Sequence, residues 1–224
     1  MKNNEHTKTF IKETILPNGS EEIFKEIENY RELMMVYNSA VRELTTKLEI
    51  LNDELSLKLG NSPIQFIKSR VKKPTSIIAK LQKLEKKVTV ESIMNSLNDV
   101  AGIRVITSFI DEVYHVAEML VKQDDIVLIE VKDYIKNPKA NGYRSYHLIV
   151  DVPVFFSNKK ESIRAEIQIR TVGMDFWASL EHQLRYKNDV KDSKIIEEEL
   201  KTCADTISET DLRMMHLRNK INEI

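Results

Sequence analysis

The segment Lys139–His147, which reads KANGYRSYH, carries the residue types best suited to chemistry in this chain. It combines cations, aromatic rings, a glycine and a histidine between two apolar stretches. A hydrophobic core needs no such mixture, whereas a planar base stacks on rings and phosphate oxygens bind cations. Tyr143 could stack on a base, while Lys139, Arg144 and His147 could hold phosphates. The alternative is a surface hairpin that turns at Gly142, with Tyr143 half packed.

Two acidic residues far apart in the sequence could hold a divalent metal ion. Asp99 shortly precedes an expected strand, and Glu166 lies on the polar face of another. Magnesium prefers one or two carboxylates, with water and phosphate oxygens completing its shell. Asp99 and Glu166 are therefore the candidate pair. The alternatives are that Asp99 only closes a turn and that Glu166 faces solvent beside Arg164 or Arg170.

The segment 68–87 is locally positive, with eight basic residues and one acid in a chain of net charge −1. Pro74 suits the first turn of a helix, and Ser76 and Lys80, four residues apart, share one face of it. Hydroxyl and ammonium groups at a helix start suit a polyphosphate. Taken alone, however, this segment is more typical of a solvated basic helix face.

Composition excludes several classes of protein. The net charge of −1 gives no global attraction to nucleic acid or to a membrane surface. The single cysteine, Cys203, excludes an internal disulfide, and with five histidines it leaves no structural zinc spacing. Five glycines hardly supply a Walker or Rossmann phosphate loop. No apolar run approaches the ~20 residues that cross a bilayer, so we expect a soluble cytoplasmic protein with no membrane partner.

Both ends of the chain carry amphipathic helical patterns. A polar segment, 1–19, is expected to be a flexible tail, and a helical region, 20–60, follows from Ser20 to Gly60. The last segment, 189–224, is expected to be a helix with a narrow apolar stripe. Each stripe could pack on its own domain or meet another subunit, and we expect a homo-oligomer. The stripe positions are Ile23, Ile27, Tyr30, Met34, Tyr37, Val41, Leu44, Leu48, Leu51 and Leu55, and then Ile196, Leu200, Cys203, Ile207, Met214, Leu217 and Ile221.

The segment 61–188 alternates between strand and helix patterns and predicts an α+β core. Its strands are expected at 103–107, 126–131, 146–154 and 163–169, the last with one wet face. A helix face is expected at 113–120, and another helix after Gly173. The pattern predicts a mixed β-sheet of about five strands flanked by helices, with long helices at both ends.

Four blocks in this segment carry a family resemblance: DVAGIR from Asp99, NGYRSYH from Asn141, EIQIRT from Glu166 and FWASLEH from Phe176. Their order and spacing resemble the synthetase domain of the RelA/SpoT family, in particular its stand-alone small alarmone synthetases, over about 62–187. The resemblance implies a nucleotidyltransferase-like fold. It also implies transfer of pyrophosphate from ATP to the 3′-hydroxyl of GDP or GTP, giving (p)ppGpp and AMP, and favours a homotetramer.

The resemblance further implies roles for single residues. Asp99 and Glu166 match the carboxylates that bind Mg²⁺, and Glu166 also matches the residue that orients or deprotonates the 3′-hydroxyl. Tyr143 matches the ring that stacks on guanine. In the ATP site, Arg70 and Arg104 match the arginines on either side of the adenine. The residues that match contacts to the ATP phosphates are Lys72, Ser76 and Lys80. The other residues that match the GDP or GTP site are Lys139, Asn141, His147 and Gln168.

One position departs from a branch of the family, and two other function classes stay open. In that branch alarmone binds a central cleft of the tetramer, and an Asn stands where this chain has Asp175. A carboxylate there would repel a phosphate, which argues against activation by alarmone.

The other classes are a catalytically silent nucleotide- or RNA-binding regulator with the same fold, and a helical oligomerisation scaffold. A pure binder gains nothing from carboxylates that face phosphates, and a scaffold leaves the four blocks unexplained.

Overall fold

The computed structural model describes residues 20–187 and 193–223 of the chain. The predicted tail, 1–19, therefore lies outside the described residues. The region 20–60 forms a single helix, and its expected end is confirmed because Gly60 takes a positive φ of 71°. In chain order the elements are α2 (Ser20–Leu59), β1 (Ile64–Val71), α3 (Pro74–Lys83), α4 (Val90–Ser96), β2 (Ala101–Thr107), α5 (Ile110–Val121), β3 (Val127–Asp133), β4 (Tyr146–Phe155), β5 (Lys160–Thr171), α6 (Val172–Lys187) and α7 (Ser193–Asn222).

The strands form one mixed sheet in the order β1-β2-β5-β4-β3. β2 and β5 are parallel, and the other neighbours are antiparallel. The predicted mixed five-stranded sheet is thus confirmed. The sequence pattern missed β1, because charged side chains such as Lys68 and Arg70 interrupt its apolar positions and most of the strand is exposed.

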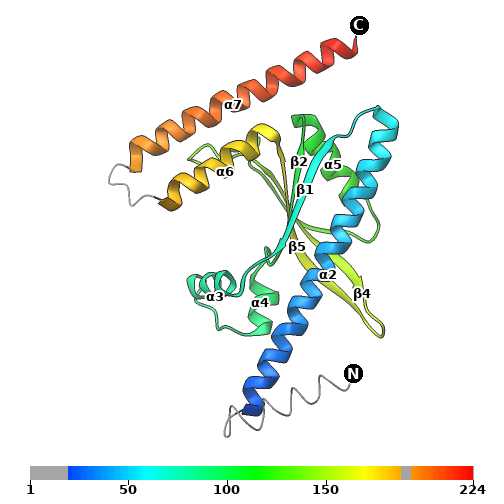
Figure 1. The fold of residues 1–224 in the computed structure, drawn as a ribbon, viewed down its shortest axis with the longest axis vertical. Coiled ribbons are helices and arrows are strands. Elements are labelled where there is room, and N and C mark those ends of the chain that lie inside the picture. Colours follow the sequence, from blue (N-terminus) through cyan, green and yellow to red (C-terminus); the bar gives the residue numbers. More distant parts are fainter. Residues whose placement is uncertain (1–19, 188–192, 224) are drawn as a thin grey trace.

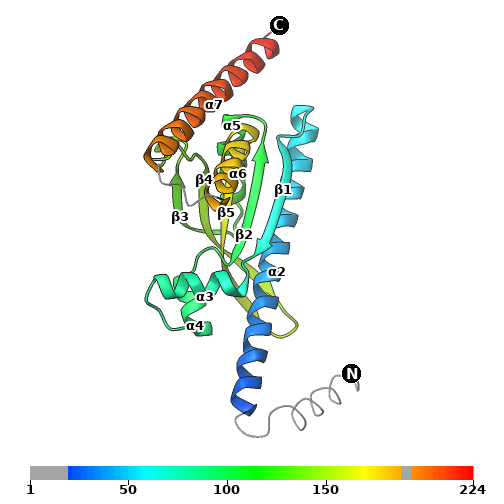
Figure 2. The same cartoon turned by 60° about the vertical axis from the view of Figure 1, so that its left-hand side comes forward.

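One face of the sheet is apolar and is covered by α2 and α5 (Figure 1). Alternate residues of each strand point to this face, so Ile103 and Ile167 are buried beneath the helices. On α5 the predicted face of Val113, Val116, Ala117 and Leu120 is buried. On α2 the stripe is buried from Tyr37 to Leu55, whereas Ile27 is exposed. The N-terminal part of α2 runs on past the sheet (Figure 2).

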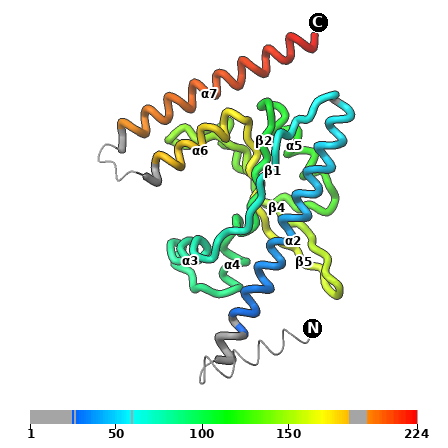
Figure 3. The backbone as a smooth tube through the Cα atoms, viewed as in Figure 1, coloured from blue at the N-terminus to red at the C-terminus, as the bar shows by residue number. Residues whose placement is uncertain are grey.

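The opposite face of the sheet carries the polar side chains. α3 and α4 lie at one end of this face, and α6 and α7 lie at the other (Figure 3). Proline at the first position of α3 confirms the predicted helix start at Pro74. No helix in the described part of the chain is long and apolar enough to cross a membrane.

The C-terminal helix, α7, contacts its own chain through different kinds of residues in its two halves. Leu200 and Ala204 of α7 join Trp177 of α6 in a small buried cluster, and Ile207 is half-buried beside it. Met214, Leu217 and Ile221 are exposed, and so is Cys203. Leu200 and Ile207 are thus the packing part of the predicted stripe, and the second half of α7 contacts α5 through the ion pairs of Arg218.

Candidate active site

The strand register aligns polar residues across the sheet. Lys68 lies opposite Arg104, Arg104 opposite Gln168, and Gln168 opposite His147. In the neighbouring row, Gly102 lies opposite Glu166. Residues directly opposite one another on adjacent strands point to the same face, so these side chains gather above the polar face.

A cavity of about 260 Å³ opens in this face. Five of the predicted site residues line it, which are Arg70, Asp99, Arg104, Glu166 and Gln168. Gly102 lies in the floor and adds no side chain there. The two carboxylates, 67 positions apart in sequence by their residue numbers 99 and 166, therefore share one cavity.

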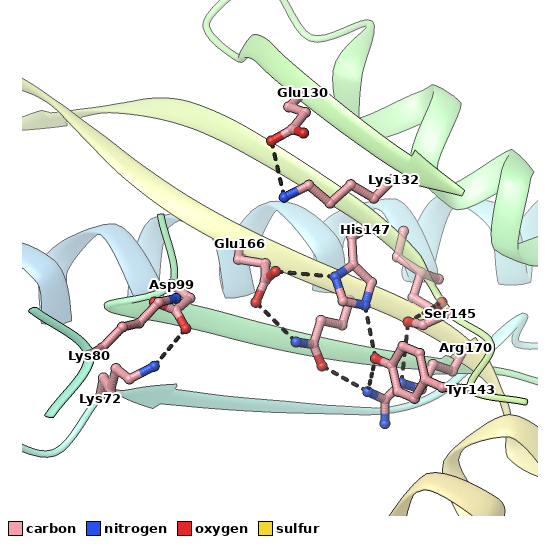
Figure 4. Close-up of polar contacts among 12 residues, drawn as sticks. Lys72, Lys80, Asp99, Glu130, Lys132, Tyr143, Ser145, His147, Glu166 and Arg170 are labelled. Atoms are coloured by element: carbon pink, nitrogen blue, oxygen red, sulfur yellow. Dashed lines mark hydrogen bonds and ion pairs between the residues drawn. The ribbon is translucent and has the colours of Figure 1, made fainter. Parts of the chain in front are cut away.

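Asp99 is held by the two lysines predicted to bind phosphate (Figure 4). Lys72 Nζ lies 2.6 Å from its Oδ2, and Lys80 Nζ lies 2.9 Å from its Oδ1. Burial acts to raise the pKa of Asp99, but the hydrogen bonds and charges of these lysines outweigh it, so the pKa is lowered. Lys72 and Lys80 are thus part of the site, whereas Ser76 is exposed in the first turn of α3 and does not line the cavity.

Glu166 is ionised and held in one orientation (Figure 4). His147 Nδ1 lies 3.1 Å from its Oε1, and Gln168 Nε2 donates to its Oε2 at 3.0 Å. Burial acts to raise the pKa of Glu166, but the hydrogen bond and charge of His147 and the bond from Gln168 outweigh it and lower the pKa. The alternative of a solvent-facing pair with Arg164 or Arg170 is wrong, because Arg164 pairs with Asp151.

His147 is buried and uses both ring nitrogens. Its Nε2 lies 2.9 Å from the hydroxyl of Tyr143, and that hydroxyl accepts a hydrogen bond from Arg170 at 2.6 Å. The contact with Tyr143 occupies Nε2, and the other ring nitrogen, Nδ1, faces the carboxylate of Glu166. His147 therefore orients the carboxylate in this conformation and has no ring nitrogen free for a phosphate.

The ring of Tyr143 belongs to a group of aromatic side chains, and the sequence did not predict one member of this group, Tyr134. Tyr134 contacts both Tyr143 and His147 edge to face, at centroid distances of 5.9 and 5.1 Å. Lys139 Nζ lies 4.9 Å from the centroid of Tyr143 and 4.7 Å from that of Tyr134. Lys139 and Tyr143 are thus brought together as predicted, and Tyr134 is an addition.

Arg170 and Asp175 are buried partners, which corrects the expectation of a wet face along β5. Arg170 is 3% exposed, and its guanidinium donates to Asp175, Gln168 and the hydroxyl of Tyr143. Asp175 Oδ1 lies 3.1 Å from Arg170 Nη1 and 3.2 Å from Arg104 Nη1. Asp175 therefore connects Arg104 of the cavity to Arg170 beneath Tyr143.

The remaining residues of the predicted loop contact helices. Asn141 Oδ1 accepts from the backbone N–H of Tyr143, and its Nδ2 donates to Glu181 of α6 at 3.3 Å. Arg144, which could have held phosphate, pairs with Asp205 of α7 instead. Gly142 has a φ of 88°, and its N–H donates to the carbonyl of Lys139. The turn at Gly142, which belonged to the alternative of a surface hairpin, is thus present.

The donor set in the cavity fits a hard cation that brings its own ligands. Within residues 20–187 and 193–223, no group of three or more His, Cys, Asp or Glu side chains forms a ready metal site. Asp99 and Glu166 offer carboxylate oxygens beside an open volume, which suits Mg²⁺ bound mainly through water and phosphate.

Comparisons with known proteins identify the family. Residues 69–191 match the model described as "Region found in RelA / SpoT proteins". The chain therefore belongs to the RelA/SpoT family. It is 41% identical to the GTP pyrophosphokinase YwaC of Bacillus subtilis, over 88% of this chain and 93% of that protein. It is 33% identical to the GTP pyrophosphokinase YjbM of the same organism, over 88% and 92%.

Solved structures agree with this assignment. The small alarmone synthetase 2 of Bacillus subtilis superposes with a TM-score of 0.77 at 41% identity, over 86% of this chain and 99% of that one. The small alarmone synthetase 1 of that organism, bound to its product pppGpp, gives 0.79 at 32% identity, over 88% and 100%. The same enzyme bound to AMPCPP gives 0.72 at 29%, over 88% and 100%. The fold predicted from the sequence blocks is thus confirmed.

Proposed function

We propose that this protein is a (p)ppGpp synthetase that transfers pyrophosphate from ATP to the 3′-hydroxyl of GDP or GTP. The observation that carries the proposal is the single cavity lined by Asp99, Glu166, Arg70 and Arg104. Relatives named GTP pyrophosphokinases, and neighbours bound to pppGpp and AMPCPP, support the same activity.

The donor nucleotide would occupy the β1–β2 side of the cavity. Arg70 and Arg104 point to the same face of adjacent strands, and planar guanidinium groups stack well on a purine. The ATP phosphates would compete with Asp99 for Lys72 and Lys80. Ser76 would offer its hydroxyl to the same phosphates at the start of α3, where backbone N–H groups also favour phosphate.

Mg²⁺ is the proposed metal, with Asp99 and Glu166 as its protein ligands. Once phosphates draw Lys72 and Lys80 away, the carboxylate of Asp99 is left to bind a cation. When bound, the ion would help to neutralise the charge of the phosphates, which is the main demand of phosphoryl-type transfer.

The acceptor nucleotide would lie on the β4 side, with guanine on Tyr143. Lys139, already beside that ring, is suited to an acceptor phosphate, while Gln168, His147 and Asn141 fix the surrounding groups. The 3′-oxygen attacks the β-phosphorus of ATP, and its proton passes to the ionised Glu166. The bond from the β-phosphorus to the α-bridging oxygen breaks, and AMP leaves with that oxygen.

The assembly and compartment are also proposals. The exposed apolar side chains of α7, among them Met214 and Leu217, support contact with further subunits, and we favour a homotetramer. The single cysteine, Cys203, supports a reducing compartment such as the cytoplasm. The near-zero net charge supports a protein without general affinity for membranes or RNA.

A product assay separates this proposal from the silent binder. The protein is incubated with ATP, Mg²⁺ and GMP, GDP or GTP in turn, and the nucleotides are resolved by anion exchange and mass spectrometry. We expect AMP to appear in equal amount with ppGpp from GDP or pppGpp from GTP. Release of ADP would contradict pyrophosphate transfer, and binding of both nucleotides without turnover would favour the regulator.

A further inference from the structure

The C-terminal helix contacts the loop that would bind the acceptor, although the family match ends at residue 191. We call residues 139–144 the acceptor loop, a name that rests on the proposed function. α7 runs beside α6 at one end of the sheet's polar face (Figure 1). Three independent contacts join its residues 200–207 to the acceptor loop or to the ring of Tyr143.

The first contact is a close backbone approach at Gly142. A Cβ atom at this position would lie 2.6 Å from Ala204 Cβ and 3.2 Å from Lys201 Cα of α7. Real Cβ atoms essentially never come that close, so the loop can turn here only as glycine against a small residue. The path of the acceptor loop is thus fitted to the surface of α7.

The second contact is made by Arg144. Its Nη2 lies 2.9 Å from Asp205 Oδ1, and its Nη1 donates to the carbonyls of Ala204, at 3.3 Å, and of Gly142, at 3.2 Å. One guanidinium therefore ties the turn of the loop to a carbonyl and a carboxylate of α7. The pKa of Asp205 is lowered by its hydrogen bonds from Arg144 and Lys201, which keeps the pair charged.

The third contact places the stacking ring itself against the helix. Tyr143 packs on the cluster of Trp177, Leu200 and Ala204, and its ring centroid lies 6.5 Å from that of Trp177. The indole N–H of Trp177 donates to the carbonyl of Leu200 at 2.8 Å in a buried hydrogen bond. The orientation of Tyr143 therefore depends on α7 through the loop backbone and through its own side chain.

From these contacts we propose that α7 forms part of the acceptor subsite, with Asp205 and Arg144 as positioning residues that hold Tyr143 for guanine. Neither residue lines the cavity where the transfer takes place. Loosening the pair should weaken binding of the guanine nucleotide and leave binding of ATP unchanged, because Lys72 and Lys80 are held by Asp99, and Arg104 by Asp175, outside α7. The binding of GDP then depends on the seating of the C-terminal helix.

The test compares two charge reversals on the same helix in the full-length protein. Asp205→Lys breaks the pair with Arg144. Glu209→Lys makes the same change of charge one turn further along, where Glu209 pairs with Arg213 of α7 itself. Arg218→Gln loosens the far end of α7 from Asp111 and serves as a control for general loosening. Affinities for GDP and for AMPCPP are measured by calorimetry, and turnover gives KM for each substrate.

We expect Asp205→Lys to weaken GDP binding about 5- to 20-fold while AMPCPP binding stays within twofold, and both controls to bind GDP as the wild type does. An equal loss in Glu209→Lys or Arg218→Gln would overturn the proposal, since charge or helix loosening alone would then explain the effect. Unchanged GDP affinity in Asp205→Lys, or an equal loss for both nucleotides, would also overturn it. A wild-type protein that binds no GDP would instead refute the proposed function.

Discussion

His147 is the residue whose role the structure changes most. The motif around it predicted a contact with the acceptor nucleotide, yet its imidazole is buried between Glu166 and the hydroxyl of Tyr143. The hydrogen bond between His147 and Glu166 is enough to orient a general base. Binding of a phosphate would need a ring nitrogen of His147 without another partner. The chemistry of the site thus depends on an ordered chain of hydrogen bonds rather than on separate polar groups.

Single residues were predictable to different degrees. The two carboxylates and the basic residues could be found because their types match phosphate and metal chemistry. Arg170 could not be assigned, because a charged residue that alternates with apolar ones along a strand looks solvent-facing until its partner, Asp175 of α6, is known. Asp175 could not be assigned because its second partner, Arg104, lies 71 positions away in the sequence. The signal that points to Arg170 is its place on the face of Glu166 and Gln168.

Tyr143 gives the first prediction. Tyr143→Ala should weaken GDP binding by ~1–3 kcal/mol, because base stacking on an aromatic ring has that range. Tyr143→Phe keeps the ring and loses the hydroxyl near His147, so it should retain most of the affinity while turnover falls. Calorimetry with GDP checks both variants. Unchanged affinity in Tyr143→Ala would contradict the stacking role, and equal losses in both variants would assign the affinity to the hydroxyl.

At the scale of elements, the apolar periodicity of the sequence predicted the helices and strands that bury one face. The helices 20–60 and 113–120 and the strand 163–169 follow the apolar face of the sheet. β1 and α4 were missed, since β1 is an edge strand with most side chains exposed and α4 has only seven residues, of which Ile93 is buried. Such elements are determined by their neighbours rather than by their own pattern.

The core of α2 gives a stability prediction. Leu48 is fully buried against the sheet, so Leu48→Ala should lower the free energy of unfolding by ~2–5 kcal/mol through lost burial and a cavity. Leu57 on the same helix is 89% exposed, and Leu57→Ala should change it by less than ~0.5 kcal/mol. Urea unfolding followed by circular dichroism measures both. Equal effects would show that α2 does not form the core of the domain.

The seat of α7 on β5 gives a pH-dependent prediction. Asp211 accepts a hydrogen bond from Thr171, but burial dominates and raises the pKa of Asp211 above its ordinary 3.8. A carboxyl group with a raised folded pKa destabilises the fold once it ionises, so this penalty is present at neutral pH and vanishes below the unfolded pKa.

Asp211→Asn should therefore raise the melting temperature at pH 7, and the gain should shrink as the pH falls toward 4. Differential scanning calorimetry across this range checks the sign. A melting temperature that drops at pH 7 would mean that the hydrogen bond to Thr171 outweighs burial.

On the scale of the whole molecule, the arrangement explains why a nearly neutral chain can handle two polyanions. The apolar face and α2 supply the stable core, and Lys68, Arg70 and Arg104 line the cavity on the other face. Affinity for nucleotides is thus local, and it needs no general attraction to nucleic acid. Helices from distant parts of the sequence lie at both ends of this face (Figure 3), so we expect substrate binding to depend on how they are seated.

The account as a whole depends on Glu166 acting as the base in the shared cavity. The direct measurement is the steady-state rate of AMP formation from ATP and GDP by Glu166→Gln, beside Glu161→Gln, which changes a carboxylate on the same strand that pairs with Lys159 at the surface. We predict that kcat falls ~10²–10⁴-fold in Glu166→Gln with the native circular dichroism spectrum retained, and stays at the wild-type value in Glu161→Gln. A near-normal kcat in folded Glu166→Gln would contradict the account.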